Sequence, residues 1–248
     1  MHTRIIIPAR YNSGRLPGKA LVPIDGKPLL QHVWTKGLYS GLDPQPIVAT
    51  DSEKIEKAAK AFGAGVVMTS SKHRCGSERV AEAAKKIDAD LIINLQGDEG
   101  FIDSSSIALL PAAFDDPEVK MATLVAPIGR QDLVSNPSIV KVVVDRYGNA
   151  LYFSRSPIPY SGDKNNGWLG HIGVYAFRKD FLLKMYTKQA GQLELAEGLE
   201  QLRVLEAGFG IKTIMVQAKH FGVNTYEDLR EVEALLDDTK PHRGGEST

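Results

Sequence analysis

Three cationic side chains gather near the amino terminus, between a short apolar run and the first helical pattern. Arg10, Arg15 and Lys19 share one short segment with Gly14 and Gly18. The glycines let backbone N–H groups approach a ligand closely. Guanidinium and ammonium groups neutralise phosphate oxygens, and a guanidinium does so with two parallel hydrogen bonds. We therefore expect a polyphosphate-binding loop, although a solvated basic loop has the same composition.

This loop differs from the common nucleotide-binding motifs. A Walker A loop has four residues between its glycines and a metal-binding Ser or Thr after its lysine. Here three residues separate Gly14 from Gly18, and Ala20 follows Lys19. A G-x-G-x-x-G motif after a strand is also missing from the sequence. These differences disfavour a P-loop NTPase and a Rossmann dehydrogenase.

Two adjacent acids follow the most apolar run of the chain. Asp98 and Glu99 follow residues 90–96, DLIINLQ, after Gly97. A carboxylate at the end of a buried strand can hold Mg²⁺ against phosphate oxygens. Neighbouring residues of a strand point to opposite faces, so we expect one ligand, Asp98. The alternative is that Asp98 is a turn or helix-capping acid.

Alternating strand and helix patterns must position these residues. Apolar helical spacing and Gly63 as a helix end indicate βαβ units. The predicted fold is therefore α/β, a doubly wound, mostly parallel sheet with ligands at the carboxyl ends of its strands. Strands are expected at 5–7 (ended by Pro8), 46–50, 65–68 and 90–96, and helices from Pro28 onward and at 52–62 and 77–87.

The pattern changes after residue 138. Short strand patterns with turn-rich connections indicate an antiparallel extension. We expect one domain over residues 1–236, in which 138–190 form a smaller subdomain, and a disordered tail at 237–248. The expected elements of this half are strands at 140–144, 150–154, 173–178 and 211–216, and helices at 195–206 and 226–236.

Composition excludes several classes of function. The 248 residues contain 30 Lys plus Arg and 30 Asp plus Glu, so no global charge favours nucleic acid or an anionic membrane. Cys75 is the single cysteine, which fits a reducing compartment. No apolar stretch is long enough for membrane insertion or a signal peptide. We expect a cytoplasmic protein.

The order of the motifs resembles one family of nucleotidyltransferases. The sequence from residue 3 to 236 is similar to the 3-deoxy-manno-octulosonate (Kdo) cytidylyltransferases, which activate a 2-keto sugar acid with CTP. The resemblance implies an α/β nucleotidyltransferase fold, a homodimer formed through the smaller subdomain, Mg²⁺, and formation of CMP-Kdo and pyrophosphate for lipopolysaccharide or capsule synthesis. The matching segments are R-x4-RLPGK at 10–19, ATD at 49–51, GSER at 76–79, N-x-QGDE at 94–99, ALYFSRSPIP at 150–159, HIGVY at 171–175, LEQLR at 199–203 and GVNTYEDL at 222–229.

The resemblance also implies roles for individual residues. Arg15, Lys19 and Asp98 are the expected catalytic residues, with Asp98 as the principal metal ligand. Lys19 and Arg15 would stabilise charge on the departing pyrophosphate. The expected nucleotide-binding residues are Ala9, Arg10, Arg15, Lys19, Gly76, Arg79 and Gln96; those of the sugar-acid pocket are Gln96, Arg155, His171, Tyr175, Glu200 and Gln201.

The sequence departs from the family pattern at a metal position. Asn224 stands where the family has an aspartate that resembles a second metal ligand. Asparagine keeps one oxygen but carries no charge, and a charge about 4 Å from Mg²⁺ is worth a few kcal/mol. We expect Asn224 to bind the metal more weakly than an aspartate. Arg74, Gly100 and Gly170 also differ from the usual residues, and Cys75 is expected to be a small buried thiol.

Other functions stay open at this stage. The same chemistry on an amino-modified Kdo, another 2-keto acid or a phosphonate is compatible with the fold. A sugar 1-phosphate nucleotidyltransferase would share the basic loop but not the set from Arg155 to Gln201. A catalytically impaired nucleotide-binding homodimer is the alternative that Asn224 suggests. Nucleic-acid binding is disfavoured, since no basic stripe alternates with aromatic residues.

Overall fold

Strand β1 lies in the centre of a sheet that is buried on both faces. Ile5 and Ile7 pack in one apolar cluster and Ile6 in another, because successive side chains of a strand point to opposite faces. Helices therefore have to cover both faces of the sheet. The structure is a computed structural model, and it describes residues 1–11, 18–129, 131–160, 167–217, 222, 228 and 230.

Among these described residues, nine strands form one sheet in the order β11-β7-β10-β6-β1-β4-β5, with β8 and β9 attached through β10. The pairs β11–β7, β6–β1, β1–β4 and β4–β5 are parallel. The predicted doubly wound, mostly parallel sheet is confirmed. The strands are β1 (Thr3–Ala9), β4 (Ile47–Thr50), β5 (Gly65–Met68), β6 (Leu91–Leu95), β7 (Met121–Pro127), β8 (Lys141–Val144), β9 (Ala150–Ser154), β10 (Leu169–Arg178) and β11 (Lys212–Met215).

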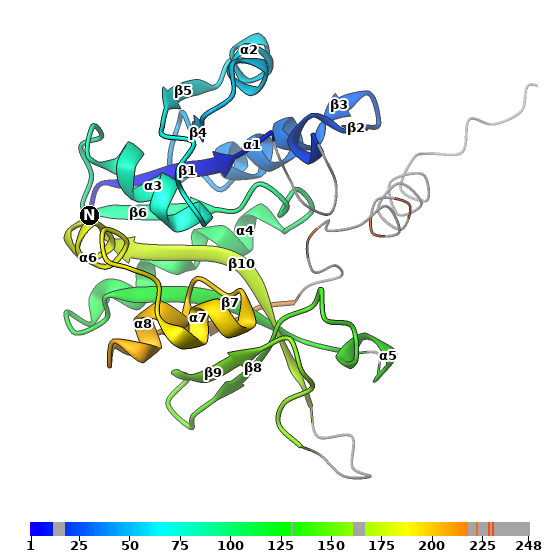
Figure 1. The fold of residues 1–248 in the computed structure, drawn as a ribbon, viewed down its shortest axis with the longest axis vertical. Helices are drawn as coiled ribbons and strands as arrows, with labels where there is room; N and C mark the ends of the chain where they lie inside the picture. Colours follow the sequence, from blue (N-terminus) through cyan, green and yellow to red (C-terminus); the bar gives the residue numbers. More distant parts are fainter. Residues whose placement is uncertain are drawn as a thin grey trace, which may run out of the picture.

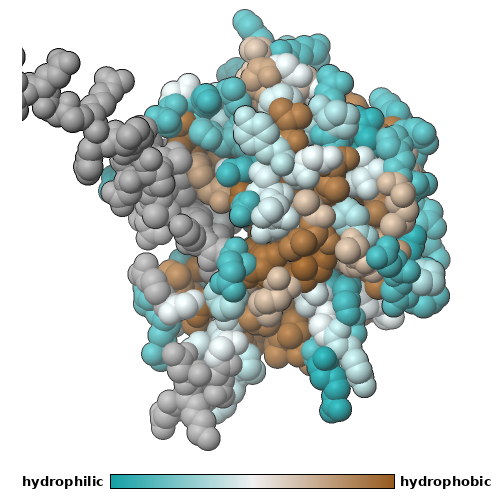
Figure 2. Space-filling model, turned by 180° about the vertical axis from the view of Figure 1, so that it is seen from behind, coloured by the Kyte–Doolittle hydropathy of each residue, from teal (hydrophilic) through white to brown (hydrophobic). Residues whose placement is uncertain are grey.

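Helices cover the two faces of this sheet (Figure 1). α1 (Leu29–Tyr39), α2 (Glu53–Ala61), α4 (Ser104–Ala108) and the 3-10 helix η2 (Leu110–Asp115) share the cluster of Ile5. α3 (Gly76–Ala84), α6 (Lys179–Met185) and α8 (Leu202–Glu206) share the cluster of Ile6. Seen from behind, apolar residues gather in the middle of the surface, with hydrophilic residues around them (Figure 2). The remaining elements are η1 (Lys19–Leu21), β2 (Pro23–Ile24), β3 (Lys27–Pro28), α5 (Gln131–Val134) and α7 (Gln192–Glu197).

Strand β10 connects the main sheet to the expected antiparallel part. It lies between β6 and β7 and is antiparallel to both. Its first residues, Leu169 and Gly170, pair with β8, and its second half pairs with β6. Residues 138–190 thus contain β8, β9, β10 and α6, and β10 continues into the middle of the main sheet.

Two sequence expectations were wrong. β1 does not end before Pro8 but continues to Ala9, because pairing with β6 stops at Ile6 while pairing with β4 continues along the other edge. The expected helix at 195–206 is two helices, α7 and α8. Gly198 adopts a left-handed φ of 64° and ends α7. This break forms the turn that carries Glu200 and Gln201.

Most other elements agree with the sequence patterns. α1, α2, α3, β4, β5, β6, β8, β9 and β11 occur where they were expected, and Gly63 after α2 has a φ of 91°. α6 was not anticipated, and β10 begins earlier than the expected strand at 173–178. The expected helix at 226–236 and tail at 237–248 lie outside the described residues. In the described part of the chain, no helix is long and apolar enough to cross a membrane.

His171 is a buried neutral side chain on β10. The Thr123 hydroxyl donates to the Val174 carbonyl at 2.7 Å, so the His171 Nε2–H donates to the Thr123 oxygen at 2.9 Å. The imidazole stacks on Tyr175 and meets the edge of Phe153. Burial lowers the pKa of His171 to about 3. The folded protein therefore keeps this imidazole uncharged at neutral pH.

This pKa predicts a contribution of His171 to acid denaturation. The unfolded chain binds a proton at this imidazole below about pH 6.5, whereas the folded chain does so only near pH 3, so stability falls as pH decreases through this window. Urea unfolding at pH 7 and pH 4.5 should show that His171→Asn loses about 2–3 kcal/mol less than the wild type between these values. The exposed His2→Asn variant is the control. Equal losses for His171→Asn and the wild type would contradict this assignment.

Candidate functional site

Two adjoining cavities open where β1 and β6 end. Their volumes are about 350 Å³ and about 420 Å³. Both are lined by Arg10, Arg74, Cys75, Gly76, Gln96 and Asp98. The carboxyl ends of neighbouring parallel strands are the usual ligand site of a doubly wound sheet. The shared wall means that molecules bound in the two cavities would meet at these residues.

The smaller cavity contains most of the residues expected to bind nucleotide. Ala9 ends β1 and Arg10 follows it, and Lys19 begins η1 after Gly18, whose φ is 69°. Gly76, Arg79 and Gln96 line the same cavity. Arg15 lies outside the described residues. The structure thus brings Arg10 and Lys19 together with Arg79, which is far from them in the sequence, as a phosphate-binding site requires.

Lys19 and Asp98 form an ion pair at this wall. The Lys19 ammonium donates to Asp98 Oδ2 at 2.9 Å, and the two side chains are 15% and 30% exposed. The two residues lie far apart in the sequence, on the segments after β1 and after β6. A cation and a partly exposed carboxylate in contact can hold a polyphosphate and a divalent cation next to each other.

Glu99 has a different environment from Asp98. Its buried carboxylate accepts a hydrogen bond from the Gly173 N–H at 2.8 Å, and Gln96 N–H donates to the Gly173 carbonyl at 3.2 Å. Burial, with a smaller effect of Asp98, raises the pKa of Glu99 to about 8. A Cβ atom at position 173 would lie 2.8 Å from Glu99 Oε1, so this close approach requires glycine. Glu99 therefore attaches the segment of Asp98 to β10.

Glu200 is the centre of a buried polar network. Gln96 Nε2 donates to Glu200 Oε1 at 2.6 Å, and the Ser77 N–H donates to Oε2 at 2.9 Å. Burial raises the pKa of Glu200. A Cβ atom at Gly76 would lie 2.6 Å from Gln96 Oε1, so glycine is needed here too. Cys75 is half-buried rather than buried as expected, and desolvation still raises the pKa of its thiol, which disfavours a reactive thiolate.

Arg203 fixes the turn that carries Glu200 and Gln201. Its guanidinium donates to Glu194 of α7 at 2.6 and 2.7 Å, and to Glu78 of α3 at 2.7 Å. Three helices are thereby joined by one buried cation with two carboxylates. Such an arrangement of buried charges is stable because every guanidinium edge has an acceptor.

The larger cavity contains all the residues expected to bind the sugar acid. Gln96, Arg155, His171, Tyr175, Glu200 and Gln201 line it. The Tyr175 hydroxyl donates to Gln201 Oε1 at 3.1 Å. Gln201 Nε2 is buried and finds no acceptor among the described residues. A buried donor without an acceptor indicates a site for a ligand oxygen.

Arg79 lines the smaller cavity, but its guanidinium mainly contacts other protein groups. Its guanidinium is buried and donates to Thr69 Oγ1 at 2.6 Å and to the Ser70 carbonyl at 3.3 Å. It also pairs with Asp51 at 3.4 Å. Only part of this side chain therefore faces a ligand, and its contacts hold the strand end at Asp51 against α3.

Sequence reasoning missed several residues of the site. Arg74, Cys75 and Glu99 line the cavities although no binding role was predicted for them. Glu194 and Ser138 come from segments that no motif singled out. The first group could have been found by its position within the motifs. The second group becomes visible only when α7 and the segment before β8 are placed beside β10.

The residues of the shared wall fit a magnesium ion. No group of three or more His, Cys, Asp or Glu that could hold a metal occurs among the described residues. Mg²⁺ does not need such a cage, since it usually keeps waters and binds one or two carboxylates plus substrate phosphates. Asp98 offers one partly exposed carboxylate beside the basic cavity. Asn224, the other expected ligand, lies outside the described residues.

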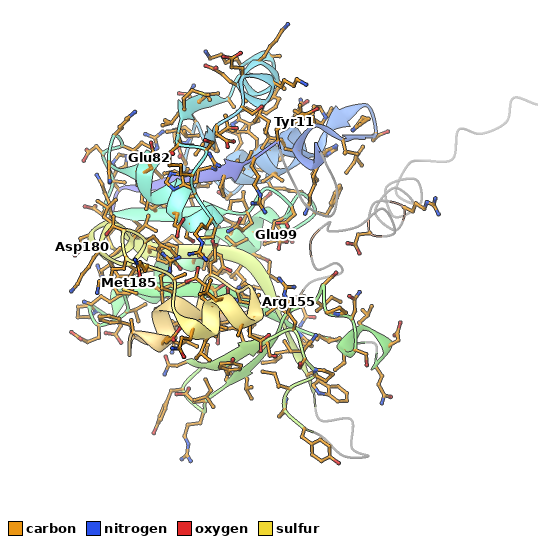
Figure 3. The ribbon with its side chains drawn as sticks, viewed as in Figure 1. Tyr11, Glu82, Glu99, Arg155, Asp180 and Met185 are labelled. Carbon is orange, nitrogen blue, oxygen red and sulfur yellow. The ribbon has the colours of Figure 1, made fainter. Side chains whose placement is uncertain are left out.

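Glu99 and Arg155 mark the extent of the site (Figure 3). Glu99 lies near the end of β6, and Arg155 lies beside α7. Both line the larger cavity, which runs from the Asp98 segment to the end of α7. The geometry therefore suits two ligands, an anion-rich one at the basic cavity and a polyhydroxylated one among the side chains of β10, α7 and α8.

Comparisons with known proteins agree with this geometry. The cytidylyltransferase family model matches residues 4–216. A 3-deoxy-manno-octulosonate cytidylyltransferase of Chlorobium limicola is 47% identical over 242 residues, which are 95% of this chain and 98% of that protein. The enzyme of the same name from Geobacter metallireducens is 46% identical over 250 residues, with 95% and 98% coverage.

Solved structures give the same result. A structure of CMP:2-keto-3-deoxy-manno-octonic acid synthetase complexed with CTP superposes with a TM-score of 0.89 at 42% identity, covering 97% of this chain and all of that one. A putative glucose-1-phosphate thymidylyltransferase from Bacillus anthracis has a TM-score of 0.69 at 15% identity, with 97% and 98% coverage, and shows a shared fold alone. The chain belongs to the cytidylyltransferase family, in the group that its 3-deoxy-manno-octulosonate cytidylyltransferase relatives represent.

Proposed function

We propose that this chain transfers CMP from CTP to Kdo, forming CMP-Kdo and pyrophosphate for lipopolysaccharide or capsule synthesis. The observation that carries the proposal is the pair of adjoining cavities with Gln96 and Asp98 in their common wall. The relatives named for this activity cover nearly the whole chain. The smaller, basic cavity takes CTP, and the larger cavity takes the sugar acid.

The reaction is a substitution at the α-phosphorus of CTP. The anomeric 2-hydroxyl of the sugar acid forms a new bond to this phosphorus, the bond to the pyrophosphate oxygen breaks, and one proton is released. Little covalent chemistry is required of the protein, so catalysis depends on positioning and on charge neutralisation. The site therefore has to hold both reactants in line and stabilise negative charge on the leaving group.

The cationic residues act on the phosphates. Arg10 and Lys19 line the smaller cavity and neutralise phosphate oxygens, and Arg15 is assigned the same role from its sequence position. Asp98 holds the Lys19 ammonium in place at 2.9 Å. Magnesium bound at Asp98, with Asn224 as the second proposed ligand, would neutralise further charge on the phosphates.

Neutral donors and acceptors orient the sugar acid. His171 is uncharged, and burial raises the pKa of Tyr175, so its hydroxyl stays protonated. Gln201 Nε2 is buried beside the larger cavity and finds no acceptor among the described residues. Glu200 accepts hydrogen bonds and holds the Gln96 amide between the two cavities. Arg155 supplies a positive charge at the end that is formed by α7.

Exposed apolar side chains support the proposed homodimer. Leu151 on β9 and Leu195 on α7 are large apolar side chains that are mostly exposed. Leu151 belongs to the subdomain 138–190, where the family resemblance places the dimer contact, and Leu195 follows it in the sequence. Exposed apolar side chains favour a protein interface, whereas Val142 of β8 and Phe153 of β9 are buried in the core. The dimer and the cytoplasmic location stay predictions.

Nucleotide and acceptor specificity test the proposed function. We expect the purified protein to release pyrophosphate with Mg²⁺, CTP and Kdo, and not when CTP is replaced by UTP, ATP or GTP. Omission of the acceptor should abolish release. Release with a sugar 1-phosphate as acceptor, or equal rates with UTP, would contradict the proposal. Nucleotide binding without any turnover would favour the impaired homodimer, and turnover only with a modified acceptor would change the substrate.

Asp98→Asn tests the charge at the shared wall. The loss of one carboxylate removes the partner of Lys19 and the proposed metal ligand, so kcat should fall by about two to three orders of magnitude. Thermal stability should change little because the side chain is partly exposed. Steady-state pyrophosphate release at saturating CTP and Kdo measures the effect, with Asp88→Asn, whose side chain is fully exposed, as the control. A kcat near that of the wild type would exclude Asp98 from catalysis.

Substitutions at Asn224 should change the Mg²⁺ concentration that gives the half-maximal rate. An added carboxylate strengthens attraction to Mg²⁺, so Asn224→Asp should lower the Mg²⁺ concentration for half-maximal rate by about tenfold. Asn224→Ala removes the remaining oxygen and should raise this concentration. Titration of Mg²⁺ in the pyrophosphate assay gives both values. An unchanged requirement in Asn224→Asp would show that residue 224 does not bind the metal.

A further inference from the structure

A lysine is buried completely beside the larger cavity. Lys141, the first residue of β8, has no exposed surface. Its ammonium donates to the Asn136 carbonyl at 3.0 Å, the Ile139 carbonyl at 2.7 Å and the Arg155 carbonyl at 2.5 Å. Each of its three N–H bonds thus has one backbone acceptor. The ammonium joins the segment before β8 to the residue that follows β9.

Arg155 is fixed by the same group of contacts. Its backbone N–H donates to the Glu197 carboxylate at 3.0 Å, while its carbonyl accepts from Lys141. Its guanidinium donates to the Glu197 carbonyl at 2.9 Å and the Pro137 carbonyl at 2.8 Å. The cation therefore lies at the carboxyl end of α7, where the helix dipole favours positive charge. Lys141 and Glu197 hold the backbone of residue 155 from opposite sides.

The burial of the Lys141 ammonium costs desolvation free energy. Burial and, to a lesser extent, the nearby Arg155 cation lower the pKa of Lys141 to about 8, and only Glu197 opposes this effect. At neutral pH the side chain still carries three N–H bonds, one for each carbonyl. An apolar side chain of similar length would fill the same volume without the desolvation of a charge. The buried ammonium is thus explained better by what its acceptors position than by core packing.

The acceptors of Lys141 lead to the larger cavity. Ser138 and Arg155 line this cavity, whereas Lys141 lines neither cavity in the described part of the chain. Ser138 belongs to the segment that Lys141 holds through the Asn136 and Ile139 carbonyls. Lys141 therefore reaches the wall of this cavity through the backbone carbonyls of these residues.

We propose that Lys141 is a positioning residue for the sugar-acid half of the site, which holds Arg155 in its binding orientation through three backbone carbonyls. The inference rests on the proposed function, because that function assigns the larger cavity to the sugar acid. According to this inference, Lys141 contributes to the affinity for the acceptor although it does not contact the acceptor. The nucleotide half of the site does not depend on it, since none of the Lys141 acceptors lines the smaller cavity.

Steady-state kinetics of Lys141 variants test this role. Lys141→Met should raise the KM for Kdo by about tenfold and leave the KM for CTP within about twofold. Lys141→Gln keeps two N–H donors without the charge and should give an intermediate KM for Kdo. Lys179→Met is the matched control, because the Lys179 ammonium donates to one backbone carbonyl, that of Ile87 at 2.6 Å, and lines neither cavity. Equal increases in both KM values would overturn the proposal.

A double-mutant cycle separates positioning from a general structural effect. If Lys141 acts through Arg155, Lys141→Met should raise the KM for Kdo much less in an Arg155→Ala background than in the wild type. The effect of Lys141→Met on the melting temperature should persist in the Arg155→Ala background. Independent, multiplicative effects of the two substitutions on the KM for Kdo would overturn the proposal.

A crystal structure of Lys141→Gln gives a readout without activity. Displacement of the Arg155 guanidinium from the Glu197 and Pro137 carbonyls would support positioning, and an unchanged Arg155 would overturn it. If the wild type releases no pyrophosphate with CTP and Kdo, the proposed function fails while this structure still decides the role of Lys141. If neither Lys141→Met nor Lys141→Gln folds, Lys141 is a folding residue and the proposal is overturned.

Discussion

The position of β10 between β6 and β7 is the constraint on which the site depends. At Gly173, this antiparallel strand accepts a hydrogen bond from the Gln96 N–H and donates one to the Glu99 carboxyl group. Gly173 thus lies directly beside the turn that carries Asp98. The same strand carries His171 and Tyr175 into the larger cavity. The strand that lines the larger cavity is therefore bonded to the segment that carries Asp98. A side chain at position 173 would push the two apart.

Charge is distributed differently in the two halves. The smaller cavity is lined by Arg10, Arg79 and Lys19, and the Lys19 ammonium is held by Asp98. The larger cavity shares Arg10 and Arg74 with it and adds Arg155, but its part on β10 carries His171 and Tyr175, which burial keeps neutral. A polyphosphate needs charge neutralisation, whereas sugar hydroxyls need directional donors and acceptors. This division matches the two substrates of a sugar-acid cytidylyltransferase.

Two buried cations, Arg203 and Lys141, line neither cavity but connect the elements around the larger one. Arg203 joins α3, α7 and α8 through two carboxylates, and Lys141 joins the segment before β8 to Arg155 through backbone carbonyls. Both are buried, so removal of either would leave buried acceptors without a donor. A binding site on several separate elements requires such links, because small displacements of its residues reduce affinity and rate.

Local sequence patterns determined the strand and helix alternation, the basic loop that ends at Lys19 and the acid after the apolar strand at 90–96, since side-chain periodicity reports which residues share a face. The resemblance to a known family added the residues from Arg155 to Gln201. Only the tertiary structure decided the place of β10, the break at Gly198 and the contact of Lys19 with Asp98. The burial of Lys141 and Glu99 was likewise invisible in the sequence. These features depend on hydrogen bonds and desolvation between residues far apart in the chain, which local periodicity does not encode.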